Sequence, residues 1–86
     1  MTQEQRAGLA RLMLCWPEGR AALRLMSASD IPLLDLCEAY NLACNAAAYW
    51  SKSNSANAAE IADEYRSLVP EIEAEARQRV NGPRGS

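Results

Sequence analysis

Three cysteines are the residues best suited to chemistry, and two of them, Cys37 and Cys44, lie in an alanine-rich and aromatic stretch at residues 36–50. A cysteine thiolate can act as a nucleophile or bind zinc, and two cysteines can form a disulfide. In a helix the seven-residue spacing separates Cys37 from Cys44 by about 10 Å, too far for a shared zinc ion or a disulfide. A zinc site would also need Cys15 and a carboxylate, because the chain has no histidine.

The lack of histidine also argues against a catalytic thiol, which needs a base to activate it. We interpret Cys37 and Cys44 as small hydrophobic residues that face the core, with a low-pKa catalytic thiol as the remaining alternative. Paired glutamates could hold two metal ions, but such sites in helical bundles combine glutamates with Glu-x-x-His motifs. The chain also lacks a Gly-rich phosphate loop, a Gly-x-Ser-x-Gly motif and a Cys-x-x-Cys motif. The sequence therefore predicts no catalytic residue, no cofactor and no metal ion, and a protein that is not an enzyme.

Helical periodicity covers almost the whole chain, and no segment alternates apolar and polar residues as a half-buried strand would. A chain of 86 residues supports one small hydrophobic core. We predict an all-α fold, a compact bundle of about four helices in one domain of residues 1–82, followed by a flexible tail of residues 83–86. The predicted helices span residues 2–16, 17–26, 30–51 and about 54–81.

Capping residues and prolines set the ends of these predicted helices. Thr2 and Gln5 can form a capping box, and Pro17 ends the first helix and begins the second. Pro70 is expected to kink the last helix without breaking it, because the apolar pattern continues past it. Gly82 has the backbone freedom that a helix end requires. The long third helix should form the centre of the bundle. Its predicted core residues are Leu33, Leu36, Cys37, Tyr40, Ala43, Cys44 and Ala47, and those of the last helix are Ala58, Ile61, Ala62, Tyr65, Leu68, Val69, Ile72 and Ala76.

Charge is unevenly distributed along the chain, although the net charge is only −2. Six acidic residues and one arginine give residues 60–75 a charge of −5. Within that segment Glu60, Glu64, Glu71 and Glu75 fall on one stripe of the last helix. Arg77 and Arg79 lie four residues after Glu73 and Glu75, and these arginines could offset part of the charge. The stripe is either a solvated helix face or a surface that binds a partner with a basic surface.

A second candidate contact surface lies on the outer side of the third helix. Leu42 and Tyr49 share this side with polar residues, so they are either covered by the first two helices or exposed for contact with a partner or a second copy in a homodimer. Residues 1–26 carry Arg6, Arg11, Arg20 and Arg24 against two glutamates, a charge of +2. These arginines are the candidate residues for binding nucleic acid, but the absence of a dense basic face makes that function less favoured.

The segment Ser27–Trp50 resembles the helical segment of phage terminase small subunits, in which an Asp-x-Pro-Leu-Leu start precedes a Glu-Ala-Tyr helix. The resemblance implies a phage or prophage origin and a small multimeric component of DNA packaging. The chain differs from that family in lacking its glycine- and proline-containing C-terminal motif and in carrying an acidic last helix. A phage origin would equally suit a small inhibitor of a host protein, for example an anti-CRISPR.

Together these patterns predict a non-enzymatic protein-interaction module that binds a larger protein, with a phage DNA-packaging component as the alternative. The first residues lack the apolar block of a secretory signal, and no run approaches the roughly 18 apolar residues of a membrane span. We therefore expect a cytoplasmic protein that does not bind membranes. The odd number of cysteines agrees with a reducing compartment.

Overall fold

The computed structural model describes residues 1–82, which contain α-helices and no strand. The elements are α1 (Gln3–Cys15), the short 3-10 helix η1 (Pro17–Gly19), α2 (Arg20–Met26), α3 (Ile31–Ser51) and α4 (Ala58–Asn81). The prediction of an all-α bundle of about four helices is confirmed. The predicted flexible tail of residues 83–86 lies outside the described residues.

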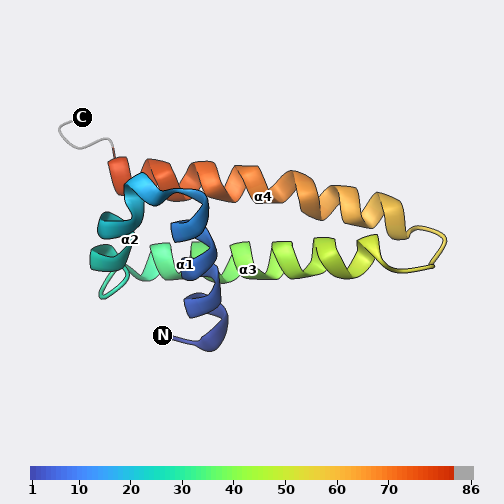
Figure 1. Ribbon diagram of the computed structural model, residues 1–86, viewed down its shortest axis with the longest axis horizontal. Coiled ribbons are helices and arrows are strands. Elements are labelled where there is room, and N and C mark those ends of the chain that lie inside the picture. Colours follow the sequence, from blue (N-terminus) through green and yellow to red (C-terminus); the bar gives the residue numbers. More distant parts are fainter. Residues whose placement is uncertain (83–86) are drawn as a thin grey trace.

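Helices α3 and α4 form an antiparallel hairpin that sets the long dimension of the molecule, 48 Å (Figure 1). Helix α1 crosses α3, and α2 lies at the end of the hairpin where α3 begins and α4 ends. Helix α3 packs against both α1 and α4, so it forms the centre of the bundle as predicted. Near the loop of residues 52–57 the hairpin consists of α3 and α4 alone (Figure 1).

Local hydrogen bonds explain where α1 and α3 begin. The predicted capping box is present, because Gln5 N–H donates to Thr2 Oγ1 over 3.1 Å and Thr2 N–H donates to Gln5 Oε1 over 3.0 Å. Asp30 caps α3 by accepting from Leu33 N–H over 3.0 Å. The second helix is not continuous from residue 17, because a 3-10 turn ends at Gly19 before α2 begins. A β-carbon at Gly19 would lie 2.3 Å from a ring carbon of the Trp16 indole, which packs against this turn.

The predicted start of α4 was three to four residues too early. Ser55 N–H donates to Ser53 Oγ over 3.1 Å, and this local bond keeps the backbone in a turn rather than a helix. Helix α4 therefore begins at Ala58. It continues unbroken through Pro70 and ends at Gly82, whose φ of 50° is the positive value expected of a glycine at a helix end.

The core lies where α1, α2, α3 and the second half of α4 meet. Its buried residues are Leu9, Leu12, Leu23, Leu33, Cys37, Tyr40, Ala76 and Val80, with half-buried residues such as Trp16, Cys44 and Ile72 packed around them. The prediction for Leu68 was wrong, because its side chain is 41% exposed. Val80, which the sequence did not single out, closes the core near the end of α4.

Helices α1 and α3 lie very close to each other at Gly8. A β-carbon at this position would lie 1.8 Å from the carbonyl oxygen of Cys37 and 3.1 Å from its α-carbon. Both are backbone atoms in the middle of a helix, so they cannot move aside as a flexible side chain would. The glycine at position 8 therefore allows the short distance between the two helices. This distance in turn determines where the side chains of α1 lie relative to α3.

Candidate interaction surfaces

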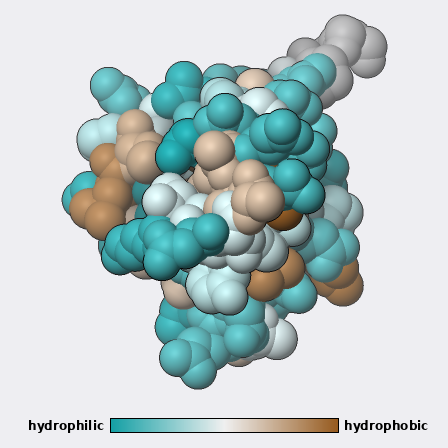
Figure 2. All heavy atoms as spheres, turned by 90° about the vertical axis from the view of Figure 1, so that its right-hand side faces the viewer, coloured by the Kyte–Doolittle hydropathy of each residue, from teal (hydrophilic) through white to brown (hydrophobic). Residues whose placement is uncertain are grey.

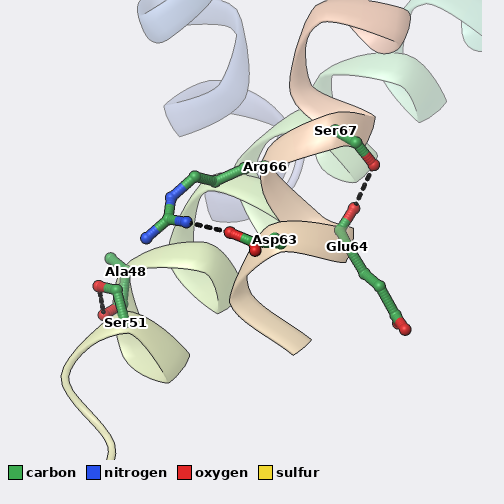
Figure 3. A network of polar contacts seen from close by, with 6 residues as sticks. All are labelled: Ala48, Ser51, Asp63, Glu64, Arg66 and Ser67. Carbon is green, nitrogen blue, oxygen red and sulfur yellow. Dashed lines mark hydrogen bonds and ion pairs between the residues drawn. The ribbon is translucent and has the colours of Figure 1, made fainter. Parts of the chain in front are cut away.

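The four glutamates of the predicted stripe are all exposed along one side of α4. Their carboxylates make no hydrogen bond or ion pair with any residue of the described range 1–82. Figure 3 shows the side chain of Glu64 extending away from α4, while its carbonyl oxygen accepts a hydrogen bond from Ser67 over 2.8 Å. Leu68 lies four residues after Glu64 and three before Glu71, so helical spacing places it beside the stripe. We call Glu60, Glu64, Leu68, Glu71 and Glu75 the α4 surface.

The arginines of α4 are occupied elsewhere, so they leave the α4 surface unneutralised. Arg66 pairs with Asp63 across one helical turn over 2.5 Å, on the side away from Glu64 (Figure 3). Arg77 stacks over the Trp16 ring, with its guanidinium carbon 5.6 Å from the ring centre. Arg79 forms an ion pair with Asp30, directly before α3.

The pair that Arg79 forms joins the end of α4 to the start of α3. Arg79 Nε donates to Asp30 Oδ1 over 2.8 Å, and the same oxygen accepts from the backbone N–H of Leu33. The bond from Arg79 and then the bond from Leu33 hold the pKa of the Asp30 carboxyl below its ordinary value. Asp30 thus caps α3 and also binds α4 through Arg79. Although the two residues are 49 positions apart in the sequence, their bond joins the start of α3 to the end of α4.

Glu73 is the acidic residue of α4 that points inward. Its Oε2 accepts a hydrogen bond from the hydroxyl of Tyr40 over 2.5 Å, and Tyr40 is only 2% exposed. The Sγ of Cys15 lies 3.2 Å from the same hydroxyl oxygen. Because the hydroxyl donates its hydrogen to Glu73, the thiol of Cys15 is the donor in the second contact. Burial first, and these two neighbours next, raise the pKa of Tyr40 above its ordinary value.

This Cys15–Tyr40–Glu73 cluster links α1, α3 and α4 in one polar chain. We interpret this cluster as a structural network, because its hydrogen bonds join three helices and the raised pKa of Tyr40 keeps the tyrosine neutral. The sequence placed Tyr40 in the core correctly. It gave no signal for Glu73, since the partner lies 33 residues away along the chain.

The remaining cysteines lie on the core side of α3 as predicted. Cys37 is fully buried and Cys44 is half-buried. Burial raises the pKa of the Cys37 thiol to about 11, which keeps it protonated at neutral pH. Residues 1–82 contain no group of three or more histidine, cysteine, aspartate or glutamate side chains that could hold a metal ion. In the same range, no helix is both long enough and apolar enough to cross a bilayer.

The other predicted contact face is also open. Leu42 is 54% exposed and Tyr49 is 67% exposed, so α1 and α2 cover neither of them. The Tyr49 ring meets Trp50 edge-on, with ring centres 5.2 Å apart and planes at 88°. Figure 2 views the molecule from the loop end of the hairpin and shows hydrophobic residues as separate patches among hydrophilic ones.

The N-terminal arginines do not form one uninterrupted basic face. Arg6, Arg20 and Arg24 are exposed, whereas Arg11 is half-buried and donates from Nη2 to Asn45 Oδ1 over 2.9 Å. Arg11 thus bridges α1 to α3. The guanidinium groups of Arg6, Arg20 and Arg24 form no ion pair within the described residues, so these three arginines remain for a contact with phosphates.

Comparisons with known proteins found no match. No family model matches the chain, and no curated protein or solved structure is significantly similar to it.

Proposed function

We propose that this protein is a non-enzymatic interaction module whose α4 surface docks on a basic surface of a larger protein. The observation that carries the proposal is the contrast among the carboxylates of α4. Asp63 and Glu73 have partners inside the chain, whereas the four glutamates of the stripe are exposed and have no partner among residues 1–82. Contacts within the described residues explain why Asp63 and Glu73 are acidic, but they do not explain the four glutamates of the stripe.

The stripe also works against the stability of its own helix. Glu60 and Glu64, like Glu71 and Glu75, are like-charge pairs one turn apart, and each pair costs a few tenths of a kcal/mol. A cationic surface on a partner would remove that repulsion on binding. Leu68 would then supply an apolar contact within a charged rim, an arrangement common in protein interfaces.

The biological form we propose is a small phage-encoded inhibitor or regulator that covers a basic site on a host protein, for example an anti-CRISPR. Such a role needs a stable fold and a complementary surface, and it needs no catalytic group. Charge complementarity would raise the association rate and select against acidic partners. The resemblance of residues 27–50 to phage terminase small subunits supports a phage origin. It supports a DNA-packaging component as the alternative, with Arg6, Arg20 and Arg24 as the exposed contacts.

Capture from a lysate with three matched baits separates these functions. The baits are the wild type, the stripe variant Glu64→Lys/Glu71→Lys and the control variant Glu4→Lys/Glu18→Lys, which changes the net charge equally at exposed positions away from the α4 surface. We expect one protein to be retained by the wild type and the control, lost from the stripe variant, and released by salt.

Two other outcomes would contradict the proposed function. Equal recovery with all three baits would show that the stripe is a solvated face. Salt-dependent binding of labelled duplex DNA that is lost with Arg20→Glu/Arg24→Glu and retained by the stripe variant would favour the DNA-packaging component.

A further inference from the structure

A groove between α1 and α3 contains a buried polar side chain that has no hydrogen-bond partner within residues 1–82. The groove has a volume of about 450 Å³. Its walls are Gln3, Glu4, Ala7 and Arg11 from α1 and Asn41, Leu42 and Asn45 from α3. It lies on a different side of the hairpin from the α4 surface, so what it binds does not depend on the proposed function.

Asn41 is the unusual member of this groove. It is only 6% exposed, and its side chain makes no hydrogen bond within residues 1–82. Its amide is nevertheless open to the groove, because that part of the chain has no fully enclosed side-chain oxygen or nitrogen without a partner. Ser27, the other buried polar residue, behaves differently and donates to the carbonyl oxygen of Arg24 over 2.9 Å. An asparagine amide offers an acceptor oxygen and two donor hydrogens, so Asn41 is equipped to bind a ligand that carries both.

A second amide lies one helical turn further along α3. Asn45 accepts the bond from Arg11 through Oδ1, which fixes its orientation and leaves its NH₂ group as a donor. Four residues of helix separate Asn41 from Asn45 by about 6 Å along the axis. In an extended peptide, groups on the same side recur every second residue, about 6.7 Å apart. The two amides therefore match the repeat of an extended main chain.

The other wall residues favour a peptide over a phosphate, a base or a sugar. One carboxylate, from Glu4, balances the one guanidinium, from Arg11, so the groove has no excess positive charge for a phosphate. No aromatic ring lines the groove on which a base or sugar ring could stack. Leu42 offers an exposed apolar contact for a ligand side chain.

We propose that this groove binds an extended peptide segment, with its main-chain amides on Asn41 and Asn45 and an apolar side chain against Leu42. A peptide group would offer the Asn41 amide a donor and an acceptor at fixed positions, which the side chain does not find within residues 1–82.

The test uses the full chain labelled with ¹⁵N and the capped peptide acetyl-Ala-Leu-Ala-amide as the probe. Its partner probe is the matched ester, in which an oxygen replaces the N–H of the central peptide bond. We expect the peptide to give saturable NMR shifts of the side-chain NH₂ signals of Asn41 and Asn45. The ester should bind about fivefold more weakly, since it lacks one hydrogen bond.

Two variants locate the effect. Asn41→Leu keeps the branched shape of the side chain but has no amide, so it should bind the peptide about fivefold more weakly and no longer distinguish it from the ester. Asn54→Leu, at an exposed loop position, should behave like the wild type. If Asn41→Leu does not fold, the comparison of peptide and ester on the wild type decides by itself.

The proposal is overturned if the peptide gives no saturable shift, if peptide and ester bind the wild type equally, or if Asn41→Leu binds the peptide as tightly as the wild type. Adenosine monophosphate serves as a competing probe. Stronger shifts of Asn41 with this nucleotide than with the peptide would also overturn the assignment, because they would indicate a phosphate or base site.

Discussion

Replacing Tyr40 by phenylalanine tests whether the hydroxyl, and not only the ring, stabilises the bundle. The substitution keeps the buried ring but removes the donor to Glu73 and the acceptor for Cys15. A hydrogen bond to a charged group contributes about 1.5–3 kcal/mol. Since Glu73 is half-buried and water can partly replace the donor, we expect a loss near the lower limit, about 1.5 kcal/mol. In a domain of this size that loss lowers the melting temperature by about 6–12 °C.

The assay is thermal and urea unfolding followed by circular dichroism, with Tyr65→Phe as the matched control. Tyr65 is a half-buried tyrosine of α4 whose hydroxyl has no hydrogen-bond partner within residues 1–82, so its loss should change stability by less than about 0.5 kcal/mol. A cycle with Glu73→Leu should give a coupling energy of about 1 kcal/mol or more with Tyr40→Phe. Zero coupling, or a Tyr40→Phe protein as stable as the wild type, would refute the reasoning. Tyr40→Ala removes the ring as well and should cost about 3–5 kcal/mol.

Three further predictions concern α1 and the cysteines. Gly8→Ala should destabilise the fold by about 1–3 kcal/mol in urea unfolding, despite the better helix propensity of alanine, because the new β-carbon meets the backbone of Cys37; a more stable variant would contradict the close crossing. A bulky thiol reagent followed by mass spectrometry should label exposed Cys15 first, Cys44 more slowly and Cys37 only after denaturant is added; rapid native labelling of Cys37 would refute its burial. The raised pKa of Cys37, about 11 against 9.0 for an exposed thiol, means that the folded protein keeps a proton that the unfolded chain loses. Stability should therefore fall between pH 9 and 11, by up to about 3 kcal/mol from this group, and Cys37→Ala should flatten that part of the profile; an unchanged slope would contradict it.

Features that depend on neighbouring residues in the chain could be predicted from the sequence. The capping box of Thr2 and Gln5 and the passage of α4 through Pro70 were read correctly, because each depends on a few adjacent residues. The start of α4 was missed since a serine side chain, Ser53, bonds to the backbone two residues ahead and competes with the helix.

Features that join distant parts of the chain could not be predicted in this way. The side chains of Glu73 and Arg79 looked like members of a charged helix surface, with Arg79 one turn after Glu75. Their actual partners, Tyr40 and Asp30, are 33 and 49 residues away. The exposure of the four stripe glutamates could be predicted, because their spacing places them on one side of the helix. Only the structure shows that the arginines of α4 pair with other residues and leave these glutamates unpaired.

The central claim is that the α4 surface binds a basic partner, and association kinetics with the purified partner test it most directly. Glu64→Lys/Glu71→Lys should fold like the wild type, because both positions are exposed and the changes remove like-charge repulsion. Its association rate constant should fall at least tenfold at low salt and lose its dependence on salt, while Glu4→Lys/Glu18→Lys keeps the wild-type rate and salt dependence. If instead the stripe variant associates as fast as the wild type at low salt and binds as tightly, the stripe is a solvated helix face and the proposed function is wrong.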